Sequence, residues 1–445
     1  MSDSQPPPQQ PNPSPSSPPG SAEPAALLLC GARLTDGRTV DVRLGGGRIE
    51  AVGTAGSLAG DPVVPGPAHP ATASFPVPAS AATDAGAATA PARVNLEGYL
   101  LLPAPVEPHA HADTALTAES DGPAPGDPQD VQRRATEAVL AQLGHGATAI
   151  RSHVRVGDVQ GLGALEAVLR VRGTVRDLVD LMVVAMPRLL TGAAGADGPA
   201  LLRDAVGMGA TVVGGCPDRD PDPTGYVEAV LDLASAHGCA VDLHTDGTDP
   251  ARLCRLASMA GGLRGGVTVG PLGGLGLLPT DVASRCADRL AAAGVGVVCL
   301  PQGGCAGADR RGTAPVRLLR AAGVRVAAGS GSLRDLSNPV GRGDPLEAAY
   351  LLASQDALPV EDAYGTVSAA GRAVLGLPPV RIEAGFPADL IAVRGDRLAG
   401  ALSLAYSRIV IHAGRVVSRT SAVREYCDLG GAGAGPELPR QARHP

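Results

Sequence analysis

The chain has 445 residues, no Trp, only two Phe and six Tyr, and a net charge of −7, so we expect an aliphatic core that is large enough for more than one domain. Scarce aromatic side chains exclude a base-stacking surface, and the scattered arginines of an acidic chain speak against a broad phosphate-binding face. We therefore expect no nucleic-acid partner.

Hydropathy and cysteine usage predict a reduced, membrane-free setting. The stretch "AALLLCGARL" is soon broken by Gly and Arg, and nothing later approaches the ~18 apolar residues of a membrane span. The eight cysteines lack CxxC pairs, which predicts reduced and mostly buried thiols. We expect a cytoplasmic protein without a membrane partner.

Three segments have the composition of chain that does not pack into a core. Residues 1–24 are rich in Pro, Ser and Gln, residues 60–92 form a Pro/Ala-rich insert, and residues 429–445 resemble the first tail. Such segments bury too little apolar surface to offset the entropy of ordering. We expect two disordered tails and a flexible insert.

Short strands are predicted near both ends of the chain. Residues 25–59 and 93–103 contain alternating runs separated by DG and GGG turns, and residues 381–428 contain "ADLIAVRGD" and "SRIVIHAGRVVS". Alternating runs divided by turn residues are typical of antiparallel strands. We expect one small β-sandwich domain built from both chain ends.

Residues 104–380 have a different pattern, in which short apolar runs alternate with helical stretches rich in Ala, Leu and Arg. The predicted strands are "ATAIRSHV", "DLMVVAM", "ATVVGG", "AVDLHTD", "GVTVG", "GVVCL" and "VRVAAGS". Near-continuous apolar strands with crossover helices indicate a parallel sheet. Roughly eight such units favour a (β/α)8 barrel of the TIM type over an open sheet.

Histidines stand where these predicted strands end. In "VEPHAHADT", His109 and His111 are one residue apart, so the alternation of a strand directs both imidazoles to one side. His244 ends a later strand, and Asp246 follows two residues on. Because the carboxyl ends of barrel strands carry the chemistry of this fold, these residues are a candidate metal site. An isolated HxH is a weak motif, and buried structural histidines remain the alternative.

Several blocks together resemble the amidohydrolase superfamily, specifically its bacterial cytosine deaminase group. They are "LLPAPVEPHAHADTALTA", "ATAIRSHVRVGD", "ATVVGGCPDRDP", "AVDLHTDGTDP", "RRGTAPVRLLRAAGVRVAAGS" and "FPADLIAVRGD", in order over about residues 25–425. The resemblance implies a (β/α)8 barrel beside a β-sandwich and hydrolytic deamination of a cyclic amidine. It also implies a small-molecule ligand and one zinc or iron ion that lowers the pKa of its bound water, and it allows a homo-oligomer.

The residues that the resemblance assigns are only partly present. His109, His111 and His244 match the three imidazole ligands of the family. Gly247 stands in place of its proton-shuttling Glu, Pro271 in place of a second catalytic His, and Gly331 in place of the Asp ligand. Arg188 stands in place of the glutamine that contacts the pyrimidine. Four functional positions therefore differ together.

Other residues are candidates for the missing roles. Asp246 is the nearest substitute base in sequence, whereas Asp335 is better explained as a loop or cap residue. Arg188 favours an anionic substrate unless it pairs with a neighbouring carboxylate. For His153, in "IRSHVRV", we favour a structural role inside the barrel. Cys216 and Cys305 are weaker candidates for soft metal ligands than for buried inert thiols.

Two hypotheses about function follow. In the first, the protein is a metal-dependent hydrolase of non-peptide C–N bonds whose chemistry has changed from that of cytosine deaminase. In the second, it is a non-catalytic relative that serves as a binding or regulatory module. Loss of one positioned acid–base group typically costs about 10²–10⁴-fold in rate, which motivates the second hypothesis. Three neutral imidazoles can still hold a metal, so tight, weak and absent metal binding all stay open.

Overall fold

A computed structural model describes residues 26–58, 91–120, 122, 124–157, 161–303, 312–356, 358–404 and 406–422. Both predicted tails, and residues 60–90 of the predicted insert, lie outside these ranges. The domain limits given above stay predictions. Within the described ranges, the helices are too short or too polar to cross a bilayer.

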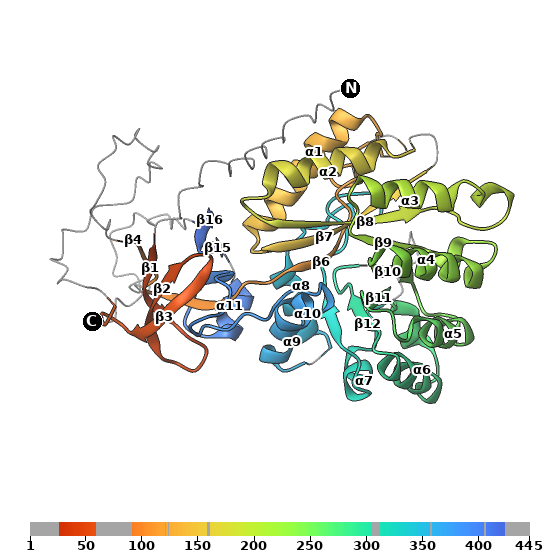
Figure 1. Cartoon of the computed structure of the whole chain (residues 1–445). Coiled ribbons are helices and arrows are strands. Elements are labelled where there is room, and N and C mark those ends of the chain that lie inside the picture. Colours follow the sequence, from red (N-terminus) through yellow and green to blue (C-terminus); the bar gives the residue numbers. More distant parts are fainter. Residues whose placement is uncertain are drawn as a thin grey trace, which may run out of the picture.

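A parallel sheet of eight strands forms the larger part of the molecule (Figure 1). Its strands follow one another along the sheet in chain order, and Ala110 also pairs with Gly331 beyond the last strand, which nearly closes a barrel. The predicted (β/α)8 fold is therefore confirmed. The strands are β6 (Glu107–Ala110), β7 (Ala149–Val156), β8 (Asp180–Pro187), β9 (Val212–Gly215), β10 (Ala240–Thr245), β11 (Val267–Pro271), β12 (Gly296–Cys299) and β13 (Val326–Ala328).

Helices surround this sheet, and several begin with the same dipeptide. Asp127, Asp222, Asp249 and Asp344 each precede a proline at the first helical position and accept backbone N–H groups of the first turn. The Asp side chain accepts backbone N–H groups of the first turn, which have no partner within the helix. Proline at the first helical position already has a helical φ, and the N–H group that it lacks would make no hydrogen bond within the helix. The longer helices are α1 (Pro128–Gly144), α2 (Gly163–Val175), α3 (Gly198–Met208), α4 (Pro223–His237), α5 (Pro250–Ala260), α6 (Thr280–Ala292) and α8 (Pro345–Ser354).

Shorter helices complete the layer. They are η2 (Ala193–Gly195), η3 (Pro217–Arg219), η4 (Gly273–Leu277), α7 (Val316–Ala321), α9 (Val360–Val367), α10 (Ala369–Val374) and α11 (Leu398–Leu404).

A second sheet contains strands from both ends of the chain, as predicted. The order is β16-β15-β14-β5-β1-β2-β3, and β4 pairs with β1. The central pairing of β5 with β14 is antiparallel and joins Pro103 to Leu390 and Tyr99 to Arg394. The strands are β1 (Leu27–Arg33), β2 (Thr39–Gly45), β3 (Arg48–Thr54), β4 (Ala92–Asn95), β5 (Tyr99–Pro103), β14 (Leu390–Arg394), β15 (Arg408–His412) and β16 (Arg415–Thr420).

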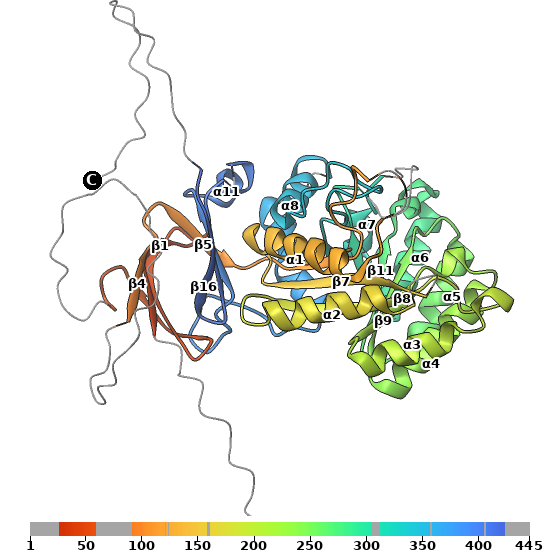
Figure 2. The same ribbon diagram turned by 90° about the horizontal axis from the view of Figure 1, so that it is seen from above.

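Alternation along β14 attaches this second sheet to the barrel. Leu390 and Ala392 belong to the core of the second sheet, whereas Ile391 and Val393 belong to the core of the barrel. Each of these four side chains is fully buried, and full burial of one Val, Leu or Ile stabilises the fold by about 1.5–3 kcal/mol. Figure 2 shows the sheet beside the barrel, with β15 and β16 in contact with α1. One strand therefore serves two cores.

A polar network spans the same junction. His412 of β15 pairs with Asp389 through Nδ1 at 2.9 Å and with Asp180 of β8 through Nε2 at 3.8 Å. Arg372 of α10 pairs with the other oxygen of Asp389 at 3.1 Å. Burial alone would lower the pKa of His412, but the hydrogen bond and charge of Asp389, with the charge of Asp180, raise it overall. His412, when protonated, thus joins the second sheet to the barrel.

We expect the stabilising effect of His412 to depend on pH. A histidine whose pKa is raised in the folded state stabilises the fold fully below its unfolded value of about 6.5. The contribution is lost as the pH rises through the folded-state pKa. In urea unfolding, His412→Gln should therefore be less stable than the wild type below pH 6.5, and the difference should shrink at alkaline pH. The exposed His237→Gln is the matched control, and an equal, pH-independent difference for both variants would contradict the assignment.

Candidate metal centre

Four imidazoles meet inside the barrel at the carboxyl ends of its strands. His109 lies on β6, His111 directly follows that strand, His153 lies on β7 and His244 on β10. One nitrogen from each ring lies within 4.8 Å of the others, and the ring centroids of His109, His153 and His244 are 4.2–4.6 Å apart. The structure thus brings together the three predicted ligands and a fourth histidine.

Three of these imidazoles, those of His109, His111 and His244, are neutral at physiological pH. Burial, followed by the mutual proximity of the rings, lowers the pKa of His111 to about 4 and the pKa values of His109 and His244 well below their usual range. Neutral imidazole is the form that binds a metal. The Nε2 atom of His244 is buried and has no hydrogen-bond partner among the described residues. A buried polar atom without a partner is costly, so the cluster fits a cation.

A second polar layer lies directly below the histidines. Arg151 precedes His153 by two residues, and Asp242 precedes His244 by two, so the alternation of β7 and β10 turns all four side chains inward. Arg151 donates to Asp242 at 2.9 Å and to Thr268 at 3.1 Å, and His153 Nε2 lies 3.4 Å from Asp242. Burial alone would raise the pKa of Asp242, but the charges of His153 and Arg151 keep it low. An ionised carboxylate therefore orients the His153 ring from below.

A carboxylate also closes the barrel next to His109. Glu107 accepts the backbone N–H groups of His109 and Ser330 at 2.9–3.1 Å, and Ser330 also donates its hydroxyl. Burial raises the pKa of Glu107 to about 7, against the opposing effect of these hydrogen bonds. Since Ser330 follows β13 and Glu107 begins β6, these bonds join the last strand to the first. The position of His109 consequently depends on closure of the barrel.

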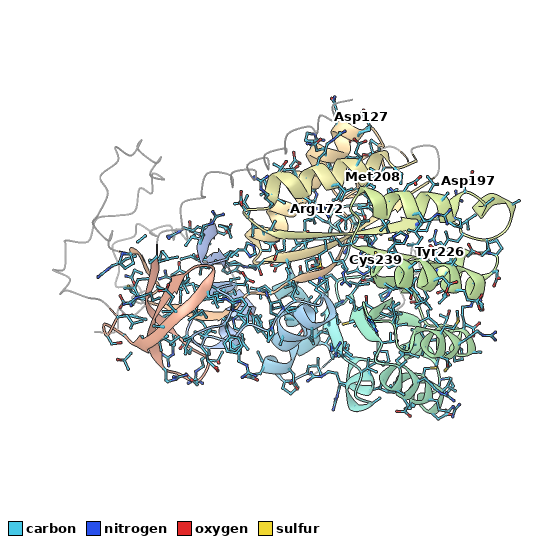
Figure 3. All side chains as sticks on the ribbon, in the orientation of Figure 1. Asp127, Arg172, Asp197, Met208, Tyr226 and Cys239 are labelled. Carbon is cyan, nitrogen blue, oxygen red and sulfur yellow. The ribbon has the colours of Figure 1, made fainter. Side chains whose placement is uncertain are left out.

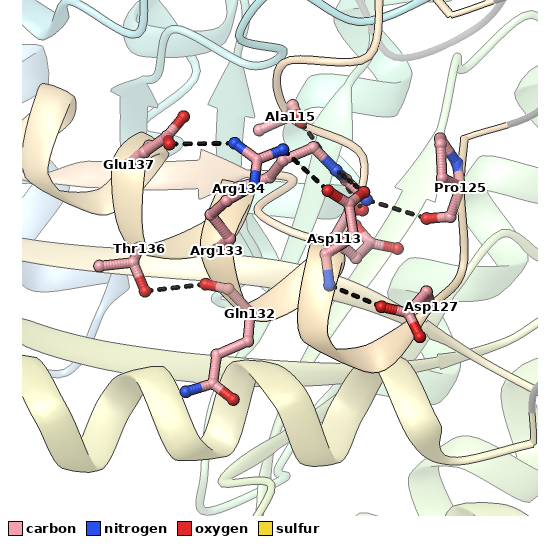
Figure 4. A network of polar contacts seen from close by, with 10 residues as sticks. Asp113, Ala115, Pro125, Asp127, Gln132, Arg133, Arg134, Thr136 and Glu137 are labelled. Atoms are coloured by element: carbon pink, nitrogen blue, oxygen red, sulfur yellow. Dashed lines mark hydrogen bonds and ion pairs between the residues drawn. The ribbon is translucent and has the colours of Figure 1, made fainter.

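The loop that follows the HxH pair is held by one buried guanidinium. Arg134 of α1 donates to the carbonyl oxygens of Asp113, Ala115 and Pro125 at 2.8–3.1 Å, and its Nε donates to Asp130 at 2.8 Å (Figure 4). Arg134 is 3% exposed. Because its planar fork satisfies three carbonyl groups at once, it fixes the path of the chain beyond the second histidine.

Two buried carboxylates lie close enough to His111 to affect its pKa, those of Asp113 and Asp335. Both oxygens of Asp335 are engaged, one by the Thr114 hydroxyl and one by two backbone N–H groups of the following turn. Asp335 is thus a loop residue, as predicted. Arg155 donates only to Oδ2 of Asp113, and among the described residues nothing donates to its buried Oδ1. Asp113 is not among the site residues predicted from the sequence.

The two remaining predicted site residues have other surroundings. Asp246 accepts the backbone N–H of Gly274 at 3.0 Å and so anchors the turn η4 after β11. Arg188 follows β8 directly and is exposed. Buried Tyr226, marked in Figure 3, donates its hydroxyl to the carbonyls of Pro187 at 2.7 Å and Gly214 at 3.3 Å. Arg188 therefore extends from a strand end that Tyr226 fixes.

Cys216 is not a member of the histidine group, and Cys305 lies outside the described residues.

Two of the four positions predicted to lack the functional side chains of the family, Gly247 and Gly331, have backbone conformations suited to glycine. Gly247 and Gly331 both have φ of +73°, in the left-handed region that other residues rarely adopt. A Cβ at Gly247 would lie 2.9 Å from a methyl group of Leu272, and a Cβ at Gly331 would lie 3.2 Å from the carbonyl oxygen of Gly303. Longer side chains would require local movement at both positions.

Known proteins are similar to this chain in fold and in part of their sequence. Pterin deaminase of Rhizobium rhizogenes is 29% identical over 375 residues, which cover 75% of this chain and 85% of that protein. The structure of N-isopropylammelide isopropylaminohydrolase from Burkholderia multivorans is similar with a TM-score of 0.72 and 26% identity, covering 89% of this chain and 99% of that one. The structure of 5-methylcytosine deaminase from Klebsiella pneumoniae, liganded with phosphonocytosine, has a TM-score of 0.72 and 26% identity, covering 90% of this chain and 100% of that one.

A family model gives the broadest statement. The model of the amidohydrolase family matches residues 124–418, which is more than half of the chain. The nearly closed barrel and the histidines at its strand ends agree with that match. The chain belongs to the amidohydrolase family.

Proposed function

We propose that the protein is a metal-dependent hydrolase that acts on a non-peptide C–N bond of a small cyclic molecule, with chemistry altered from that of its relatives. The convergence of four imidazoles at the strand ends, three of them buried, is the observation that carries the proposal. Relatives named for deamination of a pterin and of 5-methylcytosine support a nitrogen heterocycle as the substrate class.

His109, His111, His244 and His153 would hold one divalent ion, zinc or iron. The neutral state of His109, His111 and His244, and the absence of a carboxylate from this set of four, suit a borderline metal that accepts nitrogen ligands. Such an ion supplies Lewis acidity and lowers the pKa of a bound water. Asp242 would orient His153, as carboxylates that contact metal-binding histidines do.

A base is also needed, and we assign it to Asp113. Its Oδ1 is buried and has no donor among the described residues. Its charge is also close enough to the cluster to act on the pKa of His111. Asp246, the base expected from the sequence, already accepts a backbone N–H that holds a turn. Asp113 would accept a proton from the attacking water, while Arg188 remains a candidate contact for a polar substrate group.

The second candidate function is binding of a small molecule without hydrolysis. The observation in its favour is the left-handed backbone of Gly247 and Gly331, which is unsuited to the side chains that the family resemblance implies there. Both candidate functions use the bound metal, but only the first predicts turnover of a substrate.

Metal content tests the site itself. Protein stripped of metal and reloaded with Zn²⁺ should bind about one equivalent, because four imidazoles converge on one point. His109→Ala/His111→Ala should abolish this binding, and His153→Ala should weaken it, whereas the exposed His237→Ala should bind as the wild type does. Elemental analysis measures the zinc content, and competition with a chromogenic chelator measures the zinc affinity. Equal zinc in the wild type and the double variant would show that the cluster binds no metal.

The layer below the histidines can be tested separately. Asp242→Asn leaves the Arg151 guanidinium buried without its counter-ion, and breaking such a pair costs about 3–5 kcal/mol of unfolding free energy. It should also weaken zinc binding about 10–100-fold, because His153 loses its orienting carboxylate. The double variant Arg151→Met/Asp242→Leu should recover much of the stability in urea unfolding without recovering zinc affinity. Recovery of both would mean that Asp242 acts only on stability.

Turnover distinguishes hydrolysis from binding and identifies the base. Zinc- and iron-loaded protein should release ammonia or amine from at least one member of a panel of pterins, aminopyrimidines and aminotriazines. Asp113→Asn should then lower kcat about 10²–10⁴-fold with metal content retained, whereas Asp246→Asn should change it far less. Stoichiometric metal and ligand binding without turnover on any member would favour the non-catalytic function. A larger effect of Asp246→Asn would return the base to that residue.

A further inference from the structure

Two thiols face each other between neighbouring helices of the barrel. Cys254 lies in the second turn of α5 and Cys286 in the second turn of α6, with their Sγ atoms 3.5 Å apart. The two helices lie side by side (Figure 1). Cys286 is 1% exposed, whereas Cys254 is only partly buried. Cys254 is therefore the more accessible residue of the pair.

The contact between the sulfur atoms gives the two thiols different roles. Burial, followed by the contact with Cys254, raises the pKa of Cys286 to about 12, so Cys286 keeps its proton, which its Sγ donates to the carbonyl oxygen of Pro250 at 3.8 Å. The thiolate is the nucleophilic form of cysteine, so a thiol that keeps its proton reacts slowly. Cys254 is thus the more accessible member of the pair, and Cys286 is the buried, protonated member.

We propose that Cys254 and Cys286 are a site of reversible disulfide formation driven by a peroxide. The sulfur atoms need to approach by about 1.5 Å to reach the disulfide bond length of about 2.05 Å. The two side chains already face each other between packed helices. The structure holds both residues as thiols.

The chemistry balances in two steps. The Cys254 thiolate attacks one oxygen of hydrogen peroxide, the O–O bond breaks, and the departing hydroxide takes a proton to leave as water. Cys254 is then a sulfenic acid. The Cys286 sulfur attacks the Cys254 sulfur, the S–O bond breaks, and a second water leaves with the Cys286 proton. Two thiols lose two electrons and two protons, and one peroxide becomes two waters.

The disulfide would connect two walls of the histidine site. Helix α5 follows β10, which carries His244, and α6 follows β11 and the turn η4. Asp246, between β10 and α5, already accepts the backbone N–H of Gly274 in η4. The covalent bond would add to this hydrogen bond and restrict separation of the two βα units.

Mass spectrometry of the full-length protein tests the site. Reduced wild type is treated with hydrogen peroxide, denatured in N-ethylmaleimide and digested with and without reductant. We expect a linked peptide pair that contains Cys254 and Cys286 and disappears on reduction. Cys30→Ser, which removes a partly buried thiol of β1, is the matched control and should give the same linked pair. Alkylation of both thiols in oxidised wild type, or linkage of Cys254 to another cysteine, would overturn the proposal.

Single variants separate the two roles. Cys286→Ser should stop at the Cys254 sulfenic acid, which dimedone captures, whereas wild type should give little adduct because Cys286 resolves it. Cys254→Ser should leave Cys286 as a thiol under the same treatment. In oxidised wild type, amide hydrogen exchange in α5 and α6 should slow relative to the reduced form, since a cross-link opposes local opening. Dimedone capture at Cys286 in preference to Cys254 would contradict the assigned order.

Discussion

Arg151 and Asp242 face each other across the interior of the barrel, one layer below the four histidines. Both are almost fully buried, so each needs the other to remain charged in a place without water. Side chains alternate between the two faces of a strand, so the alternation that turns this pair inward also turns His153 and His244 inward two residues later. The register of β7 and β10 is thereby fixed by an ion pair, because a shift by one residue would bury an unpaired charge. The geometry of the site follows from that register.

The sequence was sufficient to predict the barrel, the second β-unit and the meeting of His109, His111 and His244, because strand alternation and the βα pattern are local properties. His153 was assigned a structural role, since one histidine inside an apolar strand has no local feature that distinguishes a ligand from a packed side chain. Its neighbours are known only once β7 lies between β6 and β8. Asp113 continues the two-residue spacing of His109 and His111, and that spacing was the signal that could have identified it.

The glycines at 247 and 331 show what the sequence could not provide. Comparison of motifs identifies which side chains are absent from these positions. The φ angles of the two glycines, and their packing against Leu272 and Gly303, are visible only in the structure. Such contacts join segments that are distant in the chain, so no local pattern contains them. Asp246 is a similar case, because its hydrogen bond to Gly274 depends on the turn after the next strand.

The shared strand β14 also constrains how the chain folds during synthesis. Strand β5 is made early, but its antiparallel partner β14 emerges from the ribosome only after the whole barrel segment has been translated. Until then β5 has an exposed edge, and the barrel lacks the Ile391 and Val393 side chains that complete its core. The nascent chain therefore exposes an apolar surface and an unpaired strand together for most of translation, which is the interval in which a chaperone would be needed.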